Sequence, residues 1–549
     1  YGLIADDQPV FADTVVRYVG EPVAAVAADD PETCRRALEA IVVDYEPLTP
    51  LLDPEAASAG THPPIHPDGN VIRHQRIVCG DPDATGDVVV EGTYEIGMQD
   101  QAFLGLEAAL AIPDAGGRGV ELHVATQWLH EDRGQIAACL GLPEDAVRLV
   151  LGGVGGAFGA REDISLQVHT CLLALRLGRP VRIAYSRGES FLGHVHRHPA
   201  TIWMRHHATA AGEIVKIESR MVLDGGAYAS TSSAVLINAV THAQGPYRCP
   251  NAVVDGYAVR TNHLPCGAMR GFGVVQACFA HESQMDKLAL ACDLDQAEIR
   301  QRNAMRTGDR LITGQPVLNV APVERCISDT AALPLPDEPV GGRPLPDGSL
   351  DVMKLPGAAG RTTSPGDVVR GIGWGVAMKN LMSSEGFDDY STARCRLAGG
   401  VVTLKFATAE VGQGFVTIAG QIARTILGVD EVVLDRIDTG VGSAGSTSAS
   451  RQTWMSGGAV DLACRTVREL MFEHAGRTHG IDPVRLAVEG TDVVDTVSGW
   501  RLPVAEVTAG VEFDETVEYR HPPTTELDEN GQGNSHTAFA FVAQRAVVD

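Results

Sequence analysis

A glycine-rich stretch at residues 152–164, GGVGGAFGAREDI, most strongly limits how this chain can fold. Five of its first eight residues are glycines, and Phe158 is the only large side chain among these eight. Glycine permits tight turns and a close approach to a neighbouring backbone or ligand. The polar pair Arg161 and Glu162 follows at once. We therefore expect either a turn packed without a ligand or a turn that receives one.

The segments on both sides predict a strand, the glycine turn and then a helix. The run AVRLVLGG leads into the turn, and DISLQVHTCLLALRLG follows it with helical periodicity. A helix that begins here would direct free N–H groups towards an anion. A dinucleotide-binding loop is disfavoured, because the next strand, PVRIAYSR, ends in Ser186 and Arg187, where that fold places an acidic residue.

The rest of the chain predicts a mixed α/β architecture of the α+β class. The N-terminal part alternates between strand and helix patterns. Its strands are expected at 15–20, 22–28 and 42–48, around a helix at 31–41. The order of strand, glycine turn and helix recurs at 401–427, and residues 331–368 are dense in Pro and Gly. We predict domains at 1–58, 59–330 and 369–549, with a linker at 331–368.

Composition excludes several classes of function. A net charge of −26 without a basic run argues against nucleic-acid binding. The eleven cysteines form no C-x-x-C pair, so an iron–sulfur cluster or zinc ribbon within the chain is not expected. The sequence shows no signal peptide and no apolar run of membrane-spanning length, which predicts a cytoplasmic protein without a membrane partner. Both ends look cut.

Three further motifs combine small residues with single polar or aromatic side chains. In NHLPCGAMRGFG, the Arg270 guanidinium can bind an oxyanion and the Phe272 ring can stack on a flat ligand, although a surface Arg and a core Phe would look the same. The turn AEVGQGF carries the amide of Gln413. The Ser/Gly loop at 442–453, GSAGSTSASRQT, suits an anion nest or a flexible linker equally well.

A histidine-rich motif, GHVHRHPA, raises the question of a metal site. Strand spacing would direct His194, His196 and His198 to one face. No acidic ligand is adjacent, so a half-exposed segment that presents Arg197 is the preferred interpretation.

Taken together, these motifs resemble the molybdenum-binding large subunit of the xanthine dehydrogenase and aldehyde oxidase family, closest to xanthine-oxidising members. The motifs GGVGGAFGARE, HRHP, AMRGFG, VGQG and GSTSASRQT occur in the family's order. Residues 16–41 resemble its hammerhead domain, and QAFLGLEAALAIPD its segment before the first cofactor domain. The resemblance implies a hammerhead-like segment at 1–58 and two molybdopterin-binding domains at 59–330 and 369–549, the second incomplete, with the site between them.

The resemblance also implies a cofactor and the residues around it. The cofactor is molybdenum held by the dithiolene of a pterin, usually the cytosine dinucleotide form in bacteria, without a direct protein ligand. The residues expected nearest the metal are Gln101, Phe158, Arg270 and Ala449. Further cofactor contacts are expected from Gly156, Gly159, Gln413, Ser446, Thr447 and Ser450. Substrate contacts are expected from Glu162, Arg197 and Phe272.

The activity implied is hydroxylation of a purine, such as hypoxanthine or xanthine, or of a similar N-heteroaromatic substrate, with water as the oxygen source. Electrons would pass to 2Fe–2S and FAD groups on partner subunits, in an oligomeric enzyme. The family's general base is a glutamate expected beyond Asp549, so no catalytic residue is assigned here. Aldehyde oxidation and a non-catalytic scaffold are the alternatives. A carbon monoxide dehydrogenase is disfavoured, since Gly271 stands where its copper-binding cysteine would be.

Overall fold

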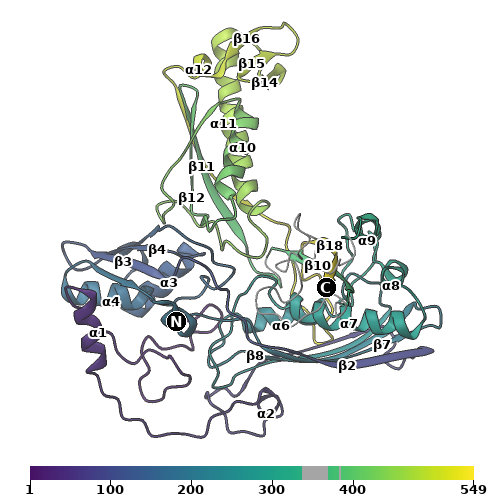
Figure 1. Ribbon diagram of the computed structural model, residues 1–549. Coiled ribbons are helices and arrows are strands. Elements are labelled where there is room, and N and C mark those ends of the chain that lie inside the picture. Colours follow the sequence, from purple (N-terminus) through teal and green to yellow (C-terminus); the bar gives the residue numbers. More distant parts are fainter. Residues whose placement is uncertain (337–368, 383–384, 549) are drawn as a thin grey trace, which may run out of the picture.

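The computed structural model describes residues 1–336, 369–382 and 385–548. Two α/β bodies lie side by side at the base, and an arm of helices and strands rises from the junction between them (Figure 1). The mixed α/β class is therefore confirmed. The predicted linker at 331–368 lies, beyond residue 336, outside the described residues.

The larger body is built on a five-stranded sheet with the order β1-β9-β8-β7-β2. Its helices α6 (Ser232–Thr241) and α7 (Val274–Ala291) pack on one face of this sheet. Apolar side chains of both layers, such as Ile202, Leu236 and Met285, are fully buried between them. The strands are β1 (Val71–Cys79), β2 (Val88–Ile96), β7 (Ala200–Ala208), β8 (Ile214–Asp224) and β9 (Asn251–Val259).

Two strands from distant parts of the chain complete the same core. The strands β10 (Gly371–Leu381) and β18 (Ala538–Val548) pair antiparallel along their whole length. Their residues Val376 and Phe539 belong to the core of the five-stranded sheet. Helices α8 (Gln296–Asn303) and α9 (Val323–Ala332) lie beside them. Residues 371–381 and 538–548 therefore both pack on the larger body, although the residues between them form the arm.

The smaller body carries the glycine-rich turn. Its four-stranded sheet has the order β5-β4-β3-β6, and helices α3 (Leu129–Leu140) and α4 (Gln167–Leu177) pack on it. Both helices end at a glycine in the left-handed conformation, Gly141 and Gly178, and the second of these ends agrees with the predicted run. The strands are β3 (Ala108–Pro113), β4 (Val120–Val124), β5 (Val147–Leu151) and β6 (Val181–Ala184).

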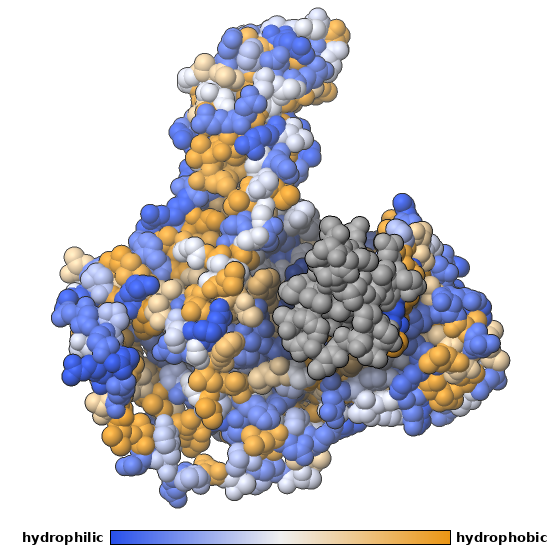
Figure 2. All heavy atoms as spheres, in the orientation of Figure 1, coloured by the Kyte–Doolittle hydropathy of each residue, from blue (hydrophilic) through white to orange (hydrophobic). Residues whose placement is uncertain are grey.

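The arm has its own sheet and core. Its strand order is β13-β12-β11-β17, and helices α10 (Phe415–Leu427) and α11 (Met455–His479) pack against it. A small sheet, β14-β15-β16, with helix α12 (Val504–Val507) forms the tip (Figure 1). Figure 2 shows hydrophobic residues along the arm and around its base. The strands are β11 (Tyr390–Ala398), β12 (Val401–Phe406), β13 (Glu431–Leu434), β14 (Leu486–Glu489), β15 (Asp492–Asp495), β16 (Arg501–Pro503) and β17 (Glu512–Arg520).

Two local predictions were wrong. The helix α1 (Pro31–Glu39) forms, but no strand forms at 15–20, 22–28 or 42–48. Val19 and Val42 are more than four-fifths exposed, and no described strand pairs with these segments. β-propensity depends on such pairing and burial. The remaining two α-helices of the first 200 residues are short: α2 (Pro54–Ser58) and α5 (Arg187–Gly193).

The helix after the glycine turn also begins later than predicted. α4 starts at Gln167, not at Asp163. Ile164 and Leu166 are instead buried in the core of the smaller body, and Asp163 Oδ1 accepts a hydrogen bond from Ser230 Oγ. Glu162 is therefore not a helix N-terminal residue.

Among the described residues, no helix is long and apolar enough to cross a bilayer.

Candidate functional site

The glycine-rich turn leaves a row of backbone donors free. Within the described residues, the N–H groups of residues 153–158 donate no hydrogen bond to the protein. Gly153, Gly155 and Phe158 are exposed, and Phe158 has a positive φ of 56°. Consecutive amide groups of this kind form a nest suited to an anionic or oxo-bearing ligand.

This turn packs against the segment 267–273. The Arg270 amide donates to Phe158 O at 2.9 Å, and Gln101 Nε2 donates to Ala268 O at 2.8 Å. Gly159 has a φ of 109°, and a Cβ there would lie 2.5 Å from Ala268 O. The Ala268 backbone therefore leaves no room for a side chain at position 159, which is the close approach to a neighbouring backbone that the glycines suggested. Arg270 itself is exposed, and the Gln101 side chain is buried.

The Ser/Gly loop at 442–453 is held by a buried ion pair. Arg451 Nε donates to Asp389 Oδ2 at 2.7 Å, and neither side chain is more than 2% exposed. Arg451 also donates to the carbonyl groups of Ala444 and Ser446. The loop is thus a built structure, not a flexible linker.

Gln127, which the sequence analysis missed, joins this loop to the glycine turn. Its Oε1 accepts from the amides of Gly159 and Arg161 at 3.1 and 3.2 Å. Its Nε2 donates to Thr447 O at 2.7 Å, and the Thr447 amide donates back to Gln127 O at 2.9 Å. A single amide side chain therefore fixes two predicted cofactor motifs that are 288 residues apart (447 against 159).

The second glycine turn is closed by its own side chains. Gln413 Nε2 donates to Ala409 O, and Gln413 Oε1 accepts from the Val411 amide. The Glu410 carboxylate accepts from the amides of Gly412, Gly414 and Val416 at the start of α10. An internal carboxylate thus binds the helix N-terminus. Thr447 Oγ1 also donates to Ala409 O, which joins this turn to the Ser/Gly loop.

Glu162 is buried beneath the Ser/Gly loop. Its side chain is hydrogen-bonded to the Ser448 hydroxyl, and Arg451 lies close enough to influence it. Burial, with a smaller contribution from Asp163, raises the pKa of Glu162 to about 8. The carboxyl is therefore neutral at pH 7 and can donate a hydrogen bond.

Arg197 is held by other residues than those around Glu162. Its Nε donates to Gln99 Oε1 at 2.8 Å and its Nη2 donates to Arg270 O at 3.0 Å, while Nη1 is buried without a partner. Desolvation lowers the pKa of its guanidinium. In the described part of the chain, no ion pair or hydrogen bond joins Arg197 to Glu162. Phe272, half-buried with a φ of 47°, lies two residues from Arg270.

Backbone strain gathers at these motifs. Nine described residues other than glycine have positive φ, and five of them lie in or next to the predicted motifs. These five are Ala102, Phe158, Phe272, Ala449 and Ser450. Such conformations cost about 1–3 kcal/mol each and persist at functional sites.

Buried polar atoms without a partner lie beside the same motifs. They include Gln101 Oε1, Arg197 Nη1 and Ser446 Oγ. An unpaired buried polar group is costly, so these atoms indicate a polar ligand. With the free amides of the glycine turn they fit an oxo-bearing metal centre on a pterin. A cavity of about 550 Å³ is lined by Gly442, Ser443 and Gly445 of the Ser/Gly loop, with Trp128 and Phe387 among others.

The histidine segment is not half-exposed as predicted. His194, His196, Arg197 and His198 are all more than nine-tenths buried. An acidic partner does exist, because Asp100 approaches from 94 residues earlier in the chain. His198 turns away and pairs with Ser232 Oγ.

We expect Gly159→Ala to lower the free energy of unfolding by about 1–3 kcal/mol. The new Cβ would force residues 268–270 away from the glycine turn. Gly97→Ala is the matched control, because no neighbouring atom lies within 4 Å of its Cβ position. Denaturant unfolding of both variants measures the difference. Equal unfolding midpoints would show that the two segments are not in contact.

Comparisons with known protein families give three domain matches along the chain. The molybdopterin cofactor-binding domain family matches residues 65–304 in one part and 350–549 in another. Residues 2–49 match the "Aldehyde oxidase and xanthine dehydrogenase, a/b hammerhead domain".

Several individual proteins are similar over long stretches. A probable xanthine dehydrogenase subunit of Bacillus subtilis is 33% identical over 83% of this chain and 59% of its own length. The nicotinate dehydrogenase large molybdopterin subunit of Eubacterium barkeri is 39% identical over 58% of this chain and 76% of its own length. The solved aldehyde oxidoreductase from Desulfovibrio gigas superposes with a TM-score of 0.81 and 25% identity, over 99% of this chain and 56% of its own. Against several of these relatives, the chain spans little more than half their length.

Proposed function

This chain belongs to the molybdenum-binding subunits of the xanthine dehydrogenase and aldehyde oxidase family, and from that premise we propose that it hydroxylates a purine or similar N-heteroaromatic compound with water as the oxygen source. Two relatives are named for such substrates, xanthine and nicotinate. The domain limits 1–58, 59–330 and 369–549 are part of the same proposal.

The observation that supports the proposal most directly is the junction of the glycine turn, the segment 267–273 and the Ser/Gly loop. Direct hydrogen bonds join the first two, and Gln127 joins the first to the third. The junction combines free amides, strained residues and unpaired buried atoms. These features are expected of a turn that binds an anionic ligand, and they would be costly in a turn that binds none.

At this junction, Gln101 Oε1, Ser446 Oγ and the free amides of residues 153–158 would hold a molybdenum cofactor. When bound, that cofactor supplies transfer of a water-derived oxygen to carbon and accepts two electrons. We assign the positions nearest the metal to Gln101, Phe158, Arg270 and Ala449. Gly156, Gly159, Gln413, Thr447 and Ser450 would contribute the turns around the pterin.

The chain's own residues would bind and orient the substrate. Arg197 Nη1 is the one guanidinium nitrogen of that residue left without a partner, and it can donate to a ring nitrogen or carbonyl. The neutral Glu162 carboxyl can donate to a second polar edge of the ring. Phe272 would stack on the ring face. Negative charge that develops on the ring would then meet the guanidinium.

The wider enzyme is also part of the proposal. The cofactor would be the cytosine dinucleotide form, and electrons would leave to 2Fe–2S and FAD groups on partner subunits of a cytoplasmic oligomer. Exposed apolar side chains fit such docking, including Leu104, which is 90% exposed beside the glycine turn.

Aldehyde oxidation is the second candidate. One observation favours it: in the described part of the chain no hydrogen bond or ion pair joins Glu162 to Arg197, and an aldehyde needs no polar pair. Turnover by the complete enzyme with hypoxanthine, nicotinate and an aromatic aldehyde separates the two. We expect the heteroaromatic compounds to have the higher kcat/KM, and a preference for the aldehyde would overturn the assignment.

A further inference from the structure

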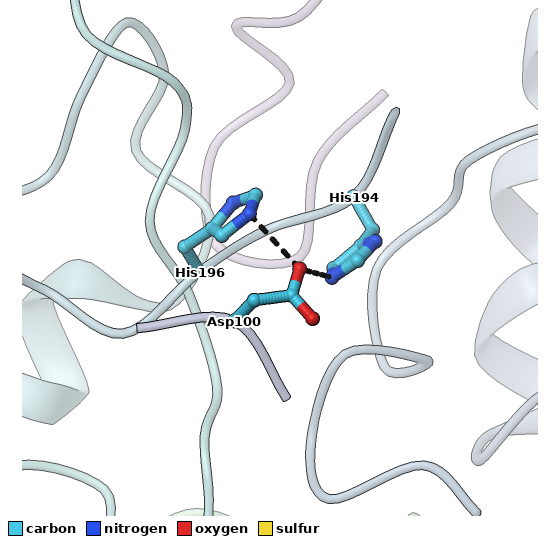
Figure 3. A group of neighbouring side chains, drawn as sticks. All are labelled: Asp100, His194 and His196. Atoms are coloured by element: carbon cyan, nitrogen blue, oxygen red, sulfur yellow. Dashed lines mark ion pairs between the residues drawn. The ribbon is translucent and has the colours of Figure 1, made fainter. Parts of the chain in front are cut away.

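Two imidazoles and a carboxylate converge in a buried position next to the proposed site (Figure 3). Asp100 Oδ2 lies 3.0 Å from His194 Nε2 and 3.2 Å from His196 Nε2. The side chains of the two histidines are 1% and 5% exposed. The imidazole rings are nearly parallel, with 4.9 Å between their centroids.

By donor–acceptor geometry, neither contact is a well-aligned hydrogen bond. Asp100 Oδ2 and both ring nitrogens of His194 are buried without a hydrogen-bonding partner. The other carboxylate oxygen, Asp100 Oδ1, is already fixed by the Ala102 amide at 2.6 Å. Burial therefore leaves one carboxylate oxygen facing two imidazole nitrogens without a well-aligned hydrogen bond to either. A positive charge at this point, either a proton on an imidazole or a bound metal ion, would offset the cost of burying the carboxylate.

The spacing of the atoms fits a metal ion. Zinc–nitrogen and zinc–oxygen bonds of about 2.0–2.1 Å at tetrahedral angles place ligand atoms roughly 3.3–3.5 Å apart. The observed separations of 3.0 and 3.2 Å are slightly shorter, and all three candidate ligand atoms lie within 4.8 Å of one another.

A second carboxylate lies behind one of the imidazoles. Glu107 Oε1 is 3.0 Å from His194 Nδ1, on the opposite edge of the ring from Asp100. The Glu107 side chain is itself buried. Metal-bound histidines commonly have a carboxylate in this position, which orients the ring and raises its basicity.

We propose that Asp100, His194 and His196 bind a divalent transition-metal ion of the zinc type, with Glu107 orienting His194. Asp100 precedes Gln101, and His196 precedes Arg197. The ion would therefore fix the two segments that carry a proposed cofactor residue and a proposed substrate residue. The Arg197 amide already donates to Gln99 O at 3.0 Å, which joins the same two segments. None of the four residues of this zinc-type site is assigned to the proposed molybdenum site.

The test measures zinc and molybdenum separately in the complete enzyme. After chelator treatment, zinc affinity is measured by competition with a chromophoric chelator, and cobalt(II) is added as a spectroscopic probe. We expect the wild type to bind an equimolar amount of zinc and to show the visible absorption of a low-coordinate cobalt(II) site. Asp100→Asn and His196→Gln should lose both. Glu107→Gln keeps all three ligands and should weaken zinc binding roughly 10- to 100-fold.

His74→Gln is the matched control, because His74 pairs with Asp255 at 2.5 Å on the exposed surface of the sheet. It should bind zinc as the wild type does. The proposal is overturned if the wild type binds neither zinc nor cobalt, which would indicate a protonated histidine between two carboxylates. It is equally overturned if His196→Gln, folded as judged by circular dichroism, retains wild-type affinity. Either result leaves the molybdenum count, and hence the proposed function, unaffected.

Discussion

Replacement of either proposed substrate-binding group is expected to reduce purine turnover roughly 100- to 1000-fold, which corresponds to about 2.7–4 kcal/mol of transition-state stabilisation. The variants are Glu162→Met and Arg197→Met, which keep side-chain volume and remove the polar contact. Turnover of an aromatic aldehyde should survive or rise in both, because an aldehyde does not use these groups. The measurement is kcat/KM of the complete enzyme with hypoxanthine and with the aldehyde.

The conservative variant Glu162→Gln refines this expectation. Since burial raises the pKa of Glu162 to about 8, the carboxyl is neutral at pH 7 and a glutamine can replace its donor. We therefore expect Glu162→Gln to lose less purine turnover than Glu162→Met.

Asp132→Asn is the control, because burial also raises the pKa of Asp132 to about 8 but the residue lies in α3, outside the site. It should change neither substrate's turnover. Equal losses on both substrates in the Glu162 and Arg197 variants would instead place these residues in cofactor binding or folding.

Arg451→Met is expected to cost about 3–5 kcal/mol of stability, because it leaves the buried Asp389 carboxylate unpaired. It also removes the donors that hold the carbonyl groups of Ala444 and Ser446. The Ser/Gly loop should then lose its shape, and cofactor content should fall with it. Denaturant unfolding and cofactor analysis measure the two effects.

Two comparisons test this explanation. Arg394→Met removes a similar pair with Asp514, but on the exposed face of the arm's sheet, where we expect at most about 1 kcal/mol. Arg451→Met combined with Asp389→Leu should recover part of the lost stability, because no charge remains buried. If Arg451→Met and Arg394→Met cost the same, the buried ion pair does not hold the loop.

Features that depend on local backbone conformation could be predicted from the sequence. Glycine alone permits certain backbone conformations and close approaches. These account for the glycine turn, the helix ends at Gly141 and Gly178, and the crowded position of Gly159. The strands expected near residues 15–48 could not be judged this way, because a strand needs a partner that a single segment does not reveal.

Features that depend on distant pairs were missed for a different reason. Gln127 contacts Thr447, 320 residues away, and nothing in the local sequence TQW distinguishes it. The histidine motif was judged without Asp100, which is brought to it only by the folded chain. A sequence shows which residues could bind a metal, but the fold decides which of them meet.

The most direct test of the proposed function is the molybdenum and pterin content of the complete enzyme, produced with molybdate and compared with enzyme produced without it. We expect equimolar molybdenum and pterin relative to this chain in the first preparation, and loss of both in Arg451→Met. A wild-type chain that is folded and assembled with its partners, yet contains neither molybdenum nor pterin, would contradict the proposed function.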